Sequence, residues 1–578
     1  MRNVDRFEVM EEHYKHFTEI HEEFVKPGSK FKLQPNDFKF MFECSVLNGA
    51  LSTHHSLFIS TLRSQSSDEQ LGWWLDKALR QEFIGCYAQT EIGIGSNVRG
   101  LQTTATFDEA TDSFILDTPT LTATKFWNTG LPSCTHCVLY AQLILKGKPM
   151  GIHVFFLQIR GADLEPLPGI EILDVGTKMG DGQADIGALR LHNVRIPRVH
   201  MLAKRQYVTK TGEYVKVGSG GKSSAKLAYL TMLQTRAGMV SGSGAVLSEA
   251  ATIAIRYSAV RKQGFVEPSK AQFTSDQNKI IDYPVQRHRL LKALSQAIVM
   301  KASGIRMQSL MMEANMEDLT ELHATSSILK AHCTTLASHG IEQMRKCCGG
   351  LGYLSSAGVS ELFCWWVGPF ETAEGDPTVL TLQTARFLIK SYQAAKKGEP
   401  LPSMTSILSR LKDPAFNPLK QGRPARATAE AIGQCNLQAL MDMMEYRSLV
   451  CTSLAGSRME ESLKRTKNFD ASWNENMRWL HAAATVHGIY FMFRAALDFI
   501  ATAEDQACRQ TLERLVAYFA LSEMEDGYQW TGLLTYEDSR AIETALAGLA
   551  GKLRNDMVAM VDAFDIADET LNSGTSGR

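Results

Sequence analysis

The chain has 578 residues, and at about 100–200 residues per domain this length predicts about three or four packing units. Its 61 Lys and Arg side chains balance 62 Asp and Glu side chains, which argues against a nucleic-acid-binding protein held by phosphate contacts. No apolar run reaches the ~18–20 residues of a membrane-spanning helix, and the 11 cysteines are too sparse for a disulfide scaffold. The acidic N-terminal segment has the pattern of neither a secretory signal nor a transit peptide. We therefore expect a large soluble intracellular protein, and an enzyme.

Residues 1–84 have the pattern of a small α domain. Ser67 and Gln70 stand at the spacing of a capping box, directly before the apolar cluster at 71–75. This predicts that a helix begins after Ser67.

Residues 85–211 have a different texture, with short β-rich runs separated by Gly, Pro and Asp. The runs lie at 113–117, 137–144, 152–159 and 189–196. In the third run, Ile152, Val154 and Phe156 alternate with the residues between them, and this period of two indicates antiparallel β-structure. Because no helical stretches of 10–15 residues separate the runs, a Rossmann-type alternation is excluded here.

Helical periodicity dominates after a Gly/Ser-rich loop at 212–224. Helices are predicted at about 225–263, 285–315, 319–346 and 378–397. One face of the second helix carries the apolar stripe of a bundle core, formed by Leu291, Leu294, Ile298, Ile305 and Met312. Five prolines between 398 and 424 mark a connection, and a further helical unit follows at 425–570. The order α, β, α, α predicts a mainly α protein with a central β domain.

Two glycine-containing motifs do not predict nucleotide sites of the common kinds. The segment GSGGKSS (218–224) would match a P-loop only if glycine stood at position 216, where the sequence has Lys216. No buried strand precedes the segment either. Gly93 and Gly95 match the start of a dinucleotide fingerprint, but Val98 replaces its third glycine. The surrounding segment nevertheless offers backbone amides and small hydroxyls to a polar planar ligand. The histidines and cysteines show no metal-ligand spacing, so no metal site is predicted.

Two later segments point to a ligand site. Three glycines in CGGLGY (348–353) follow a predicted helix, which suggests that a ligand backbone or phosphate approaches the main chain closely. In EGDPT (374–378), Asp376 is predicted to cap a helix that begins at Pro377, so Glu374 lies just before a helix N-terminus. A carboxylate there can act as a base, and free N–H groups can polarise a substrate oxygen. Taken singly, these are also the patterns of an ordinary helix C-cap and an ordinary capping-region acid.

Taken together, the segments resemble the acyl-CoA oxidase family, flavoenzymes related to the acyl-CoA dehydrogenases. The matching stretches, in the family's order across about residues 80–390, are CYAQTEIGIGSNVRGLQTTATFD, KLAYLTMLQTR, IAIRYSAVRKQ, CCGGLGY and EGDPTVLTLQTARFLIK. The resemblance implies an N-terminal α domain (1–84), a β-barrel-like domain (85–211), an FAD-binding helical bundle (225–397) and a second helical domain (425–570). It further implies FAD as cofactor, acyl-CoA and O2 as substrates, a homodimer with the flavin across the subunit interface, and a peroxisomal location.

The resemblance also assigns roles to residues. Glu374 is the base that removes the α-proton of the acyl-CoA thioester, after which a hydride passes to the flavin and O2 accepts the electrons to give hydrogen peroxide. This is the first step of fatty-acid β-oxidation. FAD contacts are implied at Gln89, Thr90, Gly95, Thr129, Arg261, Gln263, Gly349, Gly350, Gly352, Asp376 and Thr378. Lys226, Tyr229 and Arg236 match a segment near the CoA portion of the substrate.

Some residues depart from the family pattern. Thr129, Leu351 and Pro377 stand where the family commonly has glycine, histidine and asparagine, which bears on flavin affinity and substrate choice. The chain begins inside the family's α domain, and it ends in Ser-Gly-Arg rather than a peroxisomal tripeptide of the Ser-Lys-Leu type. Two alternatives stay open: an acyl-CoA dehydrogenase with a protein electron acceptor, and a catalytically idle, dimerising homologue. The second helical domain favours the oxidase, and Glu374, Thr90 and the R-x-Q signature formed by Arg261 and Gln263 argue against an idle homologue.

Overall fold

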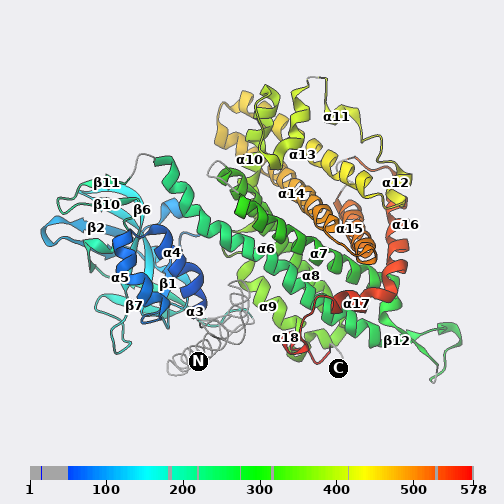
Figure 1. The fold of residues 1–578 in the computed structure, drawn as a ribbon, viewed down its shortest axis with the longest axis horizontal. Helices are drawn as coiled ribbons and strands as arrows, with labels where there is room; N and C mark the ends of the chain where they lie inside the picture. The colour runs from blue at the N-terminus through cyan, green and yellow to red at the C-terminus, as the bar shows by residue number, and fades with distance from the viewer. Residues whose placement is uncertain are drawn as a thin grey trace. The chain divides into compact units, whose positions relative to one another are not determined.

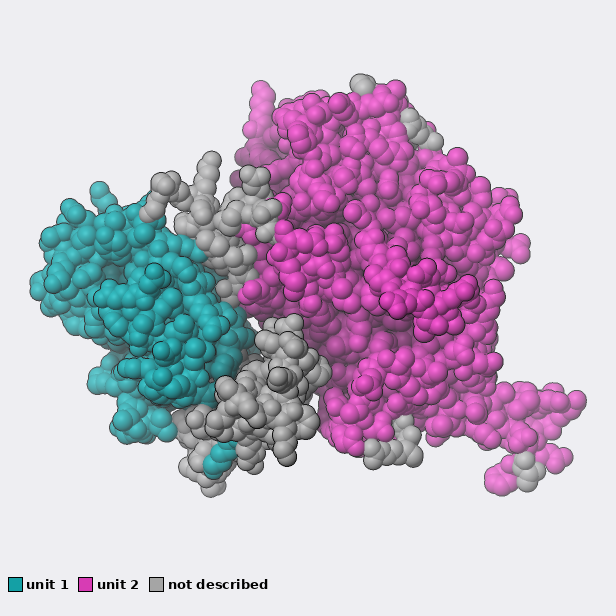
Figure 2. Space-filling view, in the orientation of Figure 1, with its two compact units in different colours: residues 1–232 teal, residues 233–578 magenta. Residues whose placement is uncertain are grey.

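The computed structural model describes Lys15 and residues 50–179, 185–217, 221–273, 275–313, 318–413, 415–527 and 532–575. Two compact units make up the chain, residues 1–232 and residues 233–578, and Figure 2 distinguishes them by colour. The first unit holds most of the β-structure and the second is mainly helical, with a short β-hairpin (Figure 1). Most of the predicted N-terminal α domain lies outside the described residues.

Short helices precede the β-structure of the first unit. They are α3 (Ala50–Thr53), the π-helical turn η2 (His54–Phe58), α4 (Ile59–Gln65) and α5 (Asp68–Leu79). The predicted capping box is confirmed: Ser67 Oγ accepts from the Gln70 main-chain N–H at 3.3 Å, and the Gln70 side chain accepts from the Ser67 N–H at 3.0 Å. The Gln70 amide also donates to the carbonyl of Met201 at 2.7 Å, which joins α5 to the β-structure.

The β-structure has a six-stranded sheet in the order β1-β5-β2-β3-β9, with β6 paired to β5, and a three-stranded sheet in the order β4-β8-β7. The strands of the larger sheet are β1 (Gly85–Ala88), β2 (Thr104–Asp108), β3 (Ser113–Asp117), β5 (His136–Leu145), β6 (Lys148–Gln158) and β9 (Val194–Pro197). Those of the smaller are β4 (Lys125–Thr129), β7 (Ile170–Asp174) and β8 (Ile186–Leu191). A separate hairpin is formed by β10 (Gln206–Val208) and β11 (Tyr214–Lys216).

Three sequence predictions about this region need correction. Strand β5 runs parallel to β1 and to β2, so the sheet is not purely antiparallel; the intervening strands supply the long crossover that a parallel pair requires. The run at 189–196 is two strands in different sheets, because the chain turns at Asn193 with a positive φ of 52°. The predicted loop at 212–224 contains strand β11 and the start of a helix at Gly221, while residues 218–220 lie outside the described residues.

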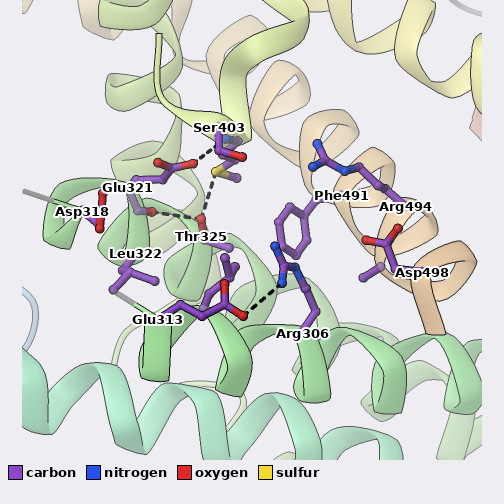
Figure 3. Close-up of a pocket in the computed structure, with 13 residues that line it drawn as sticks. Arg306, Glu313, Asp318, Glu321, Leu322, Thr325, Ser403, Phe491, Arg494 and Asp498 are labelled. Carbon is purple, nitrogen blue, oxygen red and sulfur yellow. Dashed lines mark hydrogen bonds and ion pairs between the residues drawn. The ribbon is translucent and has the colours of Figure 1, made fainter. Parts of the chain in front are cut away.

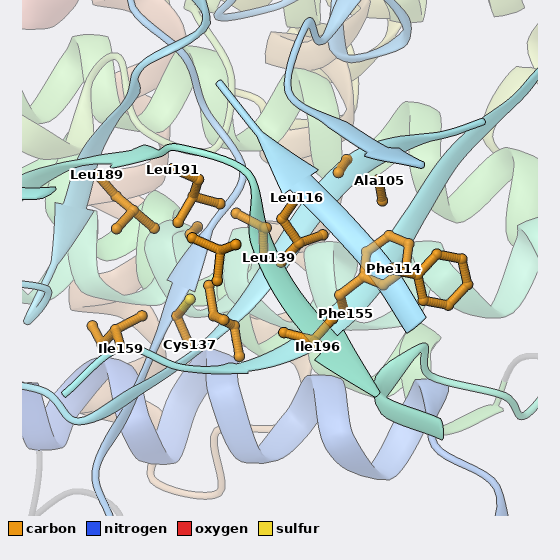
Figure 4. Close-up of a cluster of buried hydrophobic side chains, with 14 of the residues drawn as sticks. Ala105, Phe114, Leu116, Cys137, Leu139, Phe155, Ile159, Leu189, Leu191 and Ile196 are labelled. Carbon is orange, nitrogen blue, oxygen red and sulfur yellow. The ribbon is translucent and has the colours of Figure 1, made fainter. Parts of the chain in front are cut away.

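Strand β5 around 137–139 and the second half of β6 (153–157) are buried on both faces, which explains the apolar runs in these segments. On one face, Leu139 and Phe155 pack with Phe114 and Leu116 in the core drawn in Figure 4. On the other face, Phe156 stacks on Trp74 of α5, with ring centroids 4.2 Å apart and an interplanar angle of 4°. The short helices therefore cover the sheet through an aromatic contact.

The second unit is a helical bundle followed by further helices that pack on it. Its long helices are α6 (Gly221–Val260, which begins in the first unit), α7 (Pro284–Glu313), α8 (Leu319–Cys347), α10 (Pro377–Lys397), α13 (Leu437–Thr466), α14 (Phe469–Ala501), α15 (Gln506–Gly527) and α16 (Tyr536–Leu553). Shorter elements are β12 (Lys262–Phe265), β13 (Gln277–Lys279), η9 (Gly349–Tyr353), α9 (Val359–Phe370), η11 (Ser403–Lys412), α11 (Pro418–Gln421), α12 (Ala429–Gly433), α17 (Met557–Asp562) and α18 (Asp568–Leu571). The predicted helices thus match the observed ones to within a few residues at each end.

The apolar stripe predicted on α7 is correct only in its first half. Leu291, Leu294 and Ile298 are buried, but Ile305 is 51% exposed and Met312 is 83% exposed. A seven-residue repeat drifts by about 20° per heptad around a straight helix, so the stripe rotates off the core. Among the described residues, one helical stretch, Met232–Val260 of α6, is long and apolar enough to cross a membrane, and 72% of its most apolar window is buried within the protein.

Candidate active site

A strained turn directly before α10 carries Glu374. As predicted, Asp376 caps the helix and Pro377 begins it: Asp376 Oδ1 accepts from the N–H groups of Thr378 at 2.9 Å and Val379 at 3.2 Å. Glu374 has a φ of 57° and Gly375 a φ of 122°, both outside the range that L-residues prefer. A Cβ on Gly375 would lie 2.7 Å from the Leu380 side chain, so glycine is required there.

Two buried cations hold this turn by its main-chain oxygens. Arg236 on α6 donates from Nε to the Glu374 carbonyl at 3.1 Å and from Nη1 to Ser327 Oγ at 3.2 Å. Lys330 on α8 donates from Nζ to the carbonyls of Glu371 at 2.9 Å and Gly375 at 2.7 Å. Lys330 was not predicted, since a lysine within a helix gives no local signal of a main-chain partner.

The electrostatics of the turn make the Glu374 carboxylate more basic than an exposed glutamate. Burial raises the pKa of Glu374, and the positive charges of Arg236 and Lys330 oppose that rise without cancelling it. Burial, together with Arg236, lowers the pKa of Lys330 to about 8. Burial and Arg236 also lower the pKa of the neighbouring His323 to about 4, so this imidazole is neutral at pH 7. A carboxylate with a raised pKa and a fixed position is suited to proton abstraction.

The N–H groups at the start of α10 are less available than the sequence suggested. Those of Thr378 and Val379 are bound by Asp376, so they are not free to polarise a substrate oxygen. Asp376 acts here as the helix cap, and its contact with a cofactor stays a prediction.

A cleft of about 740 Å³ in the second unit brings together four residues predicted to hold FAD: Arg261, Gln263, Gly349 and Gly350. Lys346 also lines it, so the cleft contains two cations. A Cβ built on Gly349 or on Gly350 would meet no atom within 4 Å, so the main chain is open to a ligand at both glycines. An open main chain beside cations fits a phosphate-bearing group such as the pyrophosphate of FAD.

Gly352 has a different reason to be glycine. Its Cβ would lie 2.2 Å from the carbonyl oxygen of Arg345, so the close packing of η9 against the end of α8 requires it. Leu351, one of the departures from the family pattern, lines the cleft and is 38% exposed.

The first unit holds Gln89, Thr90, Gly95 and Thr129. The fully buried Lys125 donates from Nζ to the carbonyl of Gln89 at 2.9 Å, and Phe126 N–H donates to the carbonyl of Thr90 at 2.9 Å. These contacts fix the main chain that carries both predicted flavin contacts. A Cβ on Gly95 would meet nothing within 4 Å, and Thr129 ends the same strand, β4, that begins with Lys125.

Glu91 and Lys125 form a buried ion pair beside this segment. Lys125 Nζ lies 2.9 Å from Glu91 Oε1, and both side chains are fully buried. The Glu91 carboxylate also accepts from the main-chain N–H groups of Gln102 at 2.7 Å and Thr103 at 2.9 Å. Neither residue was predicted, because their pairing depends on tertiary packing between segments and gives no local signal in the sequence.

Lys226 and Tyr229 lie in the helical stretch of α6 at 221–231, whose side chains are outside the described part of the chain. A further cavity of about 260 Å³ lies among α7, α8 and α14 (Figure 3). Phe491, Arg494 and Arg306 line it, with Arg306 3.8 Å from Glu313, and none of the predicted site residues belongs to it.

The fold and the base-bearing turn define a protein of the acyl-CoA dehydrogenase and oxidase class. Three family models match the chain: acyl-coenzyme A oxidase N-terminal over residues 1–84, acyl-CoA oxidase C-alpha1 domain over 229–389 and acyl-CoA oxidase over 436–574. Peroxisomal acyl-coenzyme A oxidase 1 of Rattus norvegicus and that of Homo sapiens are each 34% identical over 532 residues, covering 90% of this chain and 78% of the relative. The chain therefore belongs to the acyl-CoA oxidase family.

Solved structures agree with this assignment. Arabidopsis thaliana acyl-CoA oxidase 1 matches with a TM-score of 0.90 and 32% identity, covering 100% of this chain and 86% of that one. Acyl-CoA oxidase-2 of Caenorhabditis elegans, bound with FAD, ascaroside-CoA and ATP, matches with a TM-score of 0.84 and 30% identity, covering 98% of this chain and 82% of that one.

Proposed function

We propose that this chain oxidises acyl-CoA to trans-2-enoyl-CoA with FAD, and that O2 accepts the electrons to give hydrogen peroxide. This is the first step of fatty-acid β-oxidation. The observation that carries the proposal is the turn at Glu374, where Arg236 and Lys330 hold the main chain that bears a carboxylate with a raised pKa.

The protein's part in the reaction is proton abstraction from a held substrate. The Glu374 carboxylate removes the α-proton of the thioester, and its raised pKa makes it a stronger base than an exposed glutamate. Because the turn is bound at three carbonyls, the carboxylate needs little reorganisation to meet the proton. The two cations also place positive charge near the enolate that forms as the proton leaves.

When bound, FAD supplies the hydride acceptor for the β-carbon. We propose that Arg261, Gln263, Gly349 and Gly350 hold its adenosine-diphosphate half in the cleft of the second unit. Gln89, Thr90, Gly95 and Thr129 in the first unit, with Asp376 and Thr378 in the second, are the proposed contacts to the rest of the cofactor.

We also propose a homodimer in the peroxisome. Apolar side chains near the FAD cleft are strongly exposed, among them Val260 (65%), Val285 (75%) and Tyr353 (84%), and a second copy of the chain would cover them. The relatives from Rattus norvegicus and Homo sapiens are named as peroxisomal. Sedimentation of the FAD-loaded protein as a monomer, or its separation from peroxisomes in fractionated cells, would contradict these points.

The variant Glu374→Gln tests the reaction. It keeps the shape of the side chain but removes the base, so we expect FAD and acyl-CoA to bind while anaerobic flavin bleaching slows by about 10²–10⁴-fold. Glu361→Gln, an exposed acid on α9, is the matched control and should bleach at the wild-type rate. A wild-type bleaching rate in Glu374→Gln would show that another residue is the base.

Reoxidation separates the open alternatives. The oxidase must consume one O2 and release one hydrogen peroxide per enoyl-CoA without an added protein acceptor. Bleaching with slow, peroxide-free reoxidation in air would indicate a dehydrogenase, and a wild-type protein that binds FAD but never bleaches with acyl-CoA would indicate an idle homologue.

A further inference from the structure

We propose that Lys330 is a positioning residue for proton abstraction, and that its buried ammonium holds Glu374 in place through the main chain on both sides of it. The proposal rests on the proposed function, in which Glu374 is the base. Lys330 does not touch the reacting atoms; it acts through the turn.

The geometry places Lys330 directly under the turn. Its side chain lies in the middle of α8 with no exposed surface, and its Nζ reaches the carbonyls of Glu371 at 2.9 Å and Gly375 at 2.7 Å. These carbonyls lie before and after Glu374 in the chain, while the carbonyl of Glu374 itself is bound by Arg236. One ammonium therefore ties both ends of the base-bearing segment to α8.

The turn needs such a hold because its backbone is unfavourable. Glu374 adopts a φ of 57° without being glycine, and Gly375 follows with a φ of 122°. Backbone conformations of this kind persist only where surrounding contacts impose them. Without the two bonds from Lys330, relaxation of the turn would move the Glu374 carboxylate away from its place.

Stability alone does not explain a lysine at this position. Both acceptors of Nζ are neutral carbonyls, and burial lowers the pKa of the ammonium to about 8. A methionine would fill similar space without the cost of burying a charge, although the two carbonyls would lose these donors. The charge does, however, have a consequence for the reaction, since it lowers the pKa of Glu374 against the effect of burial.

Within the described part of the chain, the charges of Glu374 and Lys330 act on each other and on a small set of neighbours. Arg236 on α6 acts on both, and Glu371 and Asp376, which flank Glu374 in the chain, act on Lys330. His323 on α8 lies 3.4 Å from Arg236 and is neutral above about pH 4. Removal of the Lys330 charge therefore leaves Arg236 as the cation that lowers the pKa of Glu374.

The test compares Lys330→Met and Lys330→Arg in the full-length, FAD-loaded protein. For Lys330→Met we expect unchanged FAD content, anaerobic flavin reduction slowed by about 10–100-fold, and an acidic limb of the pH–rate profile moved to higher pH, because the pKa of Glu374 rises. Lys330→Arg keeps the positive charge and the hydrogen-bond donors. The acidic limb of its pH–rate profile should therefore match that of wild type, and its flavin reduction should be close to the wild-type rate. A purely structural role would change the yield of folded protein but not the position of the limb.

Thr335→Val is the matched control. Thr335 Oγ1 donates to the Glu371 carboxylate at 3.1 Å, so the variant removes a nearby hydrogen bond and leaves the carbonyl contacts intact. We expect a rate within about twofold of wild type. If Lys330→Met yields no holoenzyme, Lys330→Gln replaces it under the same criteria, since the amide is neutral.

Flavin reduction by Lys330→Met within twofold of wild type, with an unmoved acidic limb, overturns the proposal. Glu374→Gln is measured alongside to separate the two hypotheses. If Glu374→Gln is inactive while Lys330→Met is normal, the positioning role alone is wrong; if Glu374→Gln is itself active, the base assignment is wrong and the role of Lys330 with it.

Discussion

Arg236 donates from Nε to the main-chain oxygen of Glu374 at 3.1 Å, although 138 positions separate the two residues in the sequence. The resemblance to the family had placed Arg236 near the CoA portion of the substrate. In the structure Arg236 is 2% exposed, and its guanidinium donates to the Glu374 carbonyl and to Ser327 Oγ. We therefore interpret Arg236 as support for the catalytic turn.

Arg236→Lys separates these two roles. Lysine keeps the charge but lacks the planar fork that reaches Glu374 and Ser327 together. We expect kcat for acyl-CoA oxidation to fall by about 10–100-fold with KM within about threefold of wild type, because the loss lies in positioning and not in substrate binding. A large rise in KM with unchanged kcat would instead support the contact with CoA.

A pair of glycine variants tests the FAD cleft. A Cβ on Gly350 meets nothing within 4 Å, so Gly350→Val should fold normally yet block the approach of the cofactor. We expect the purified variant to keep the thermal unfolding midpoint of the apoprotein and to lose FAD affinity by at least about tenfold, read from flavin fluorescence on titration. Gly352→Ala is the comparison. The added Cβ would lie 2.2 Å from the Arg345 carbonyl oxygen, so this variant should lower the thermal unfolding midpoint. Wild-type FAD affinity in Gly350→Val would exclude this edge of the cleft from the cofactor site.

The contrast between Gly350 and Gly352 also shows where sequence reasoning ends. The cap at Asp376 and the helix start at Pro377 were predictable, because both depend on neighbours within three residues. The helices were predictable from their periodicity. The sequence pattern is the same for Gly350 and Gly352. Only packing between segments decides that the first is open to a ligand and that the second lies against a carbonyl.

Lys330 and Lys125 were missed for a related reason. Each is a buried lysine whose Nζ donates to at least one main-chain carbonyl, and a carbonyl leaves no trace in the sequence. The parallel pairing of β5 with β1 and β2 was missed because it joins strands that are distant in the chain. The site could thus be predicted where its contacts are local, and not where tertiary contacts support it.

The ion pair of Glu91 with Lys125 should be essential to the first unit. Lys125→Met leaves the Glu91 carboxylate buried without its cation, and breaking a buried pair in this way typically costs about 3–5 kcal/mol. It also removes the hydrogen bond to the Gln89 carbonyl, so FAD content should fall even at temperatures where the protein is folded. Thermal unfolding and the flavin-to-protein absorbance ratio measure the two effects. Lys148→Met, at an exposed position of β6, is the control, and an unchanged unfolding midpoint in Lys125→Met would contradict the prediction.

His487 should make the second unit sensitive to acid. The ring is fully buried in α14, with Nδ1 2.8 Å from the Ser448 hydroxyl and Nε2 3.1 Å from the Met404 carbonyl. This arrangement suits a neutral imidazole that donates from Nε2 and accepts at Nδ1. Burial lowers its pKa to about 4, and the nearby Arg494 lowers it as well.

The sign of the pH effect follows from this lowered pKa. The unfolded state binds a proton near pH 6.5, whereas the folded state does so only near pH 4. The contribution of His487 is therefore fully present above pH 6.5 and is lost as the pH falls from 6.5 to 4, by about 3 kcal/mol in the free energy of unfolding. Gln at this position does not titrate, so urea unfolding of His487→Gln should lose less free energy over that range than wild type. His339→Gln, which alters an exposed residue of α8, should keep the wild-type pH dependence. The same dependence in His487→Gln would show that this ring does not contribute to the acid sensitivity.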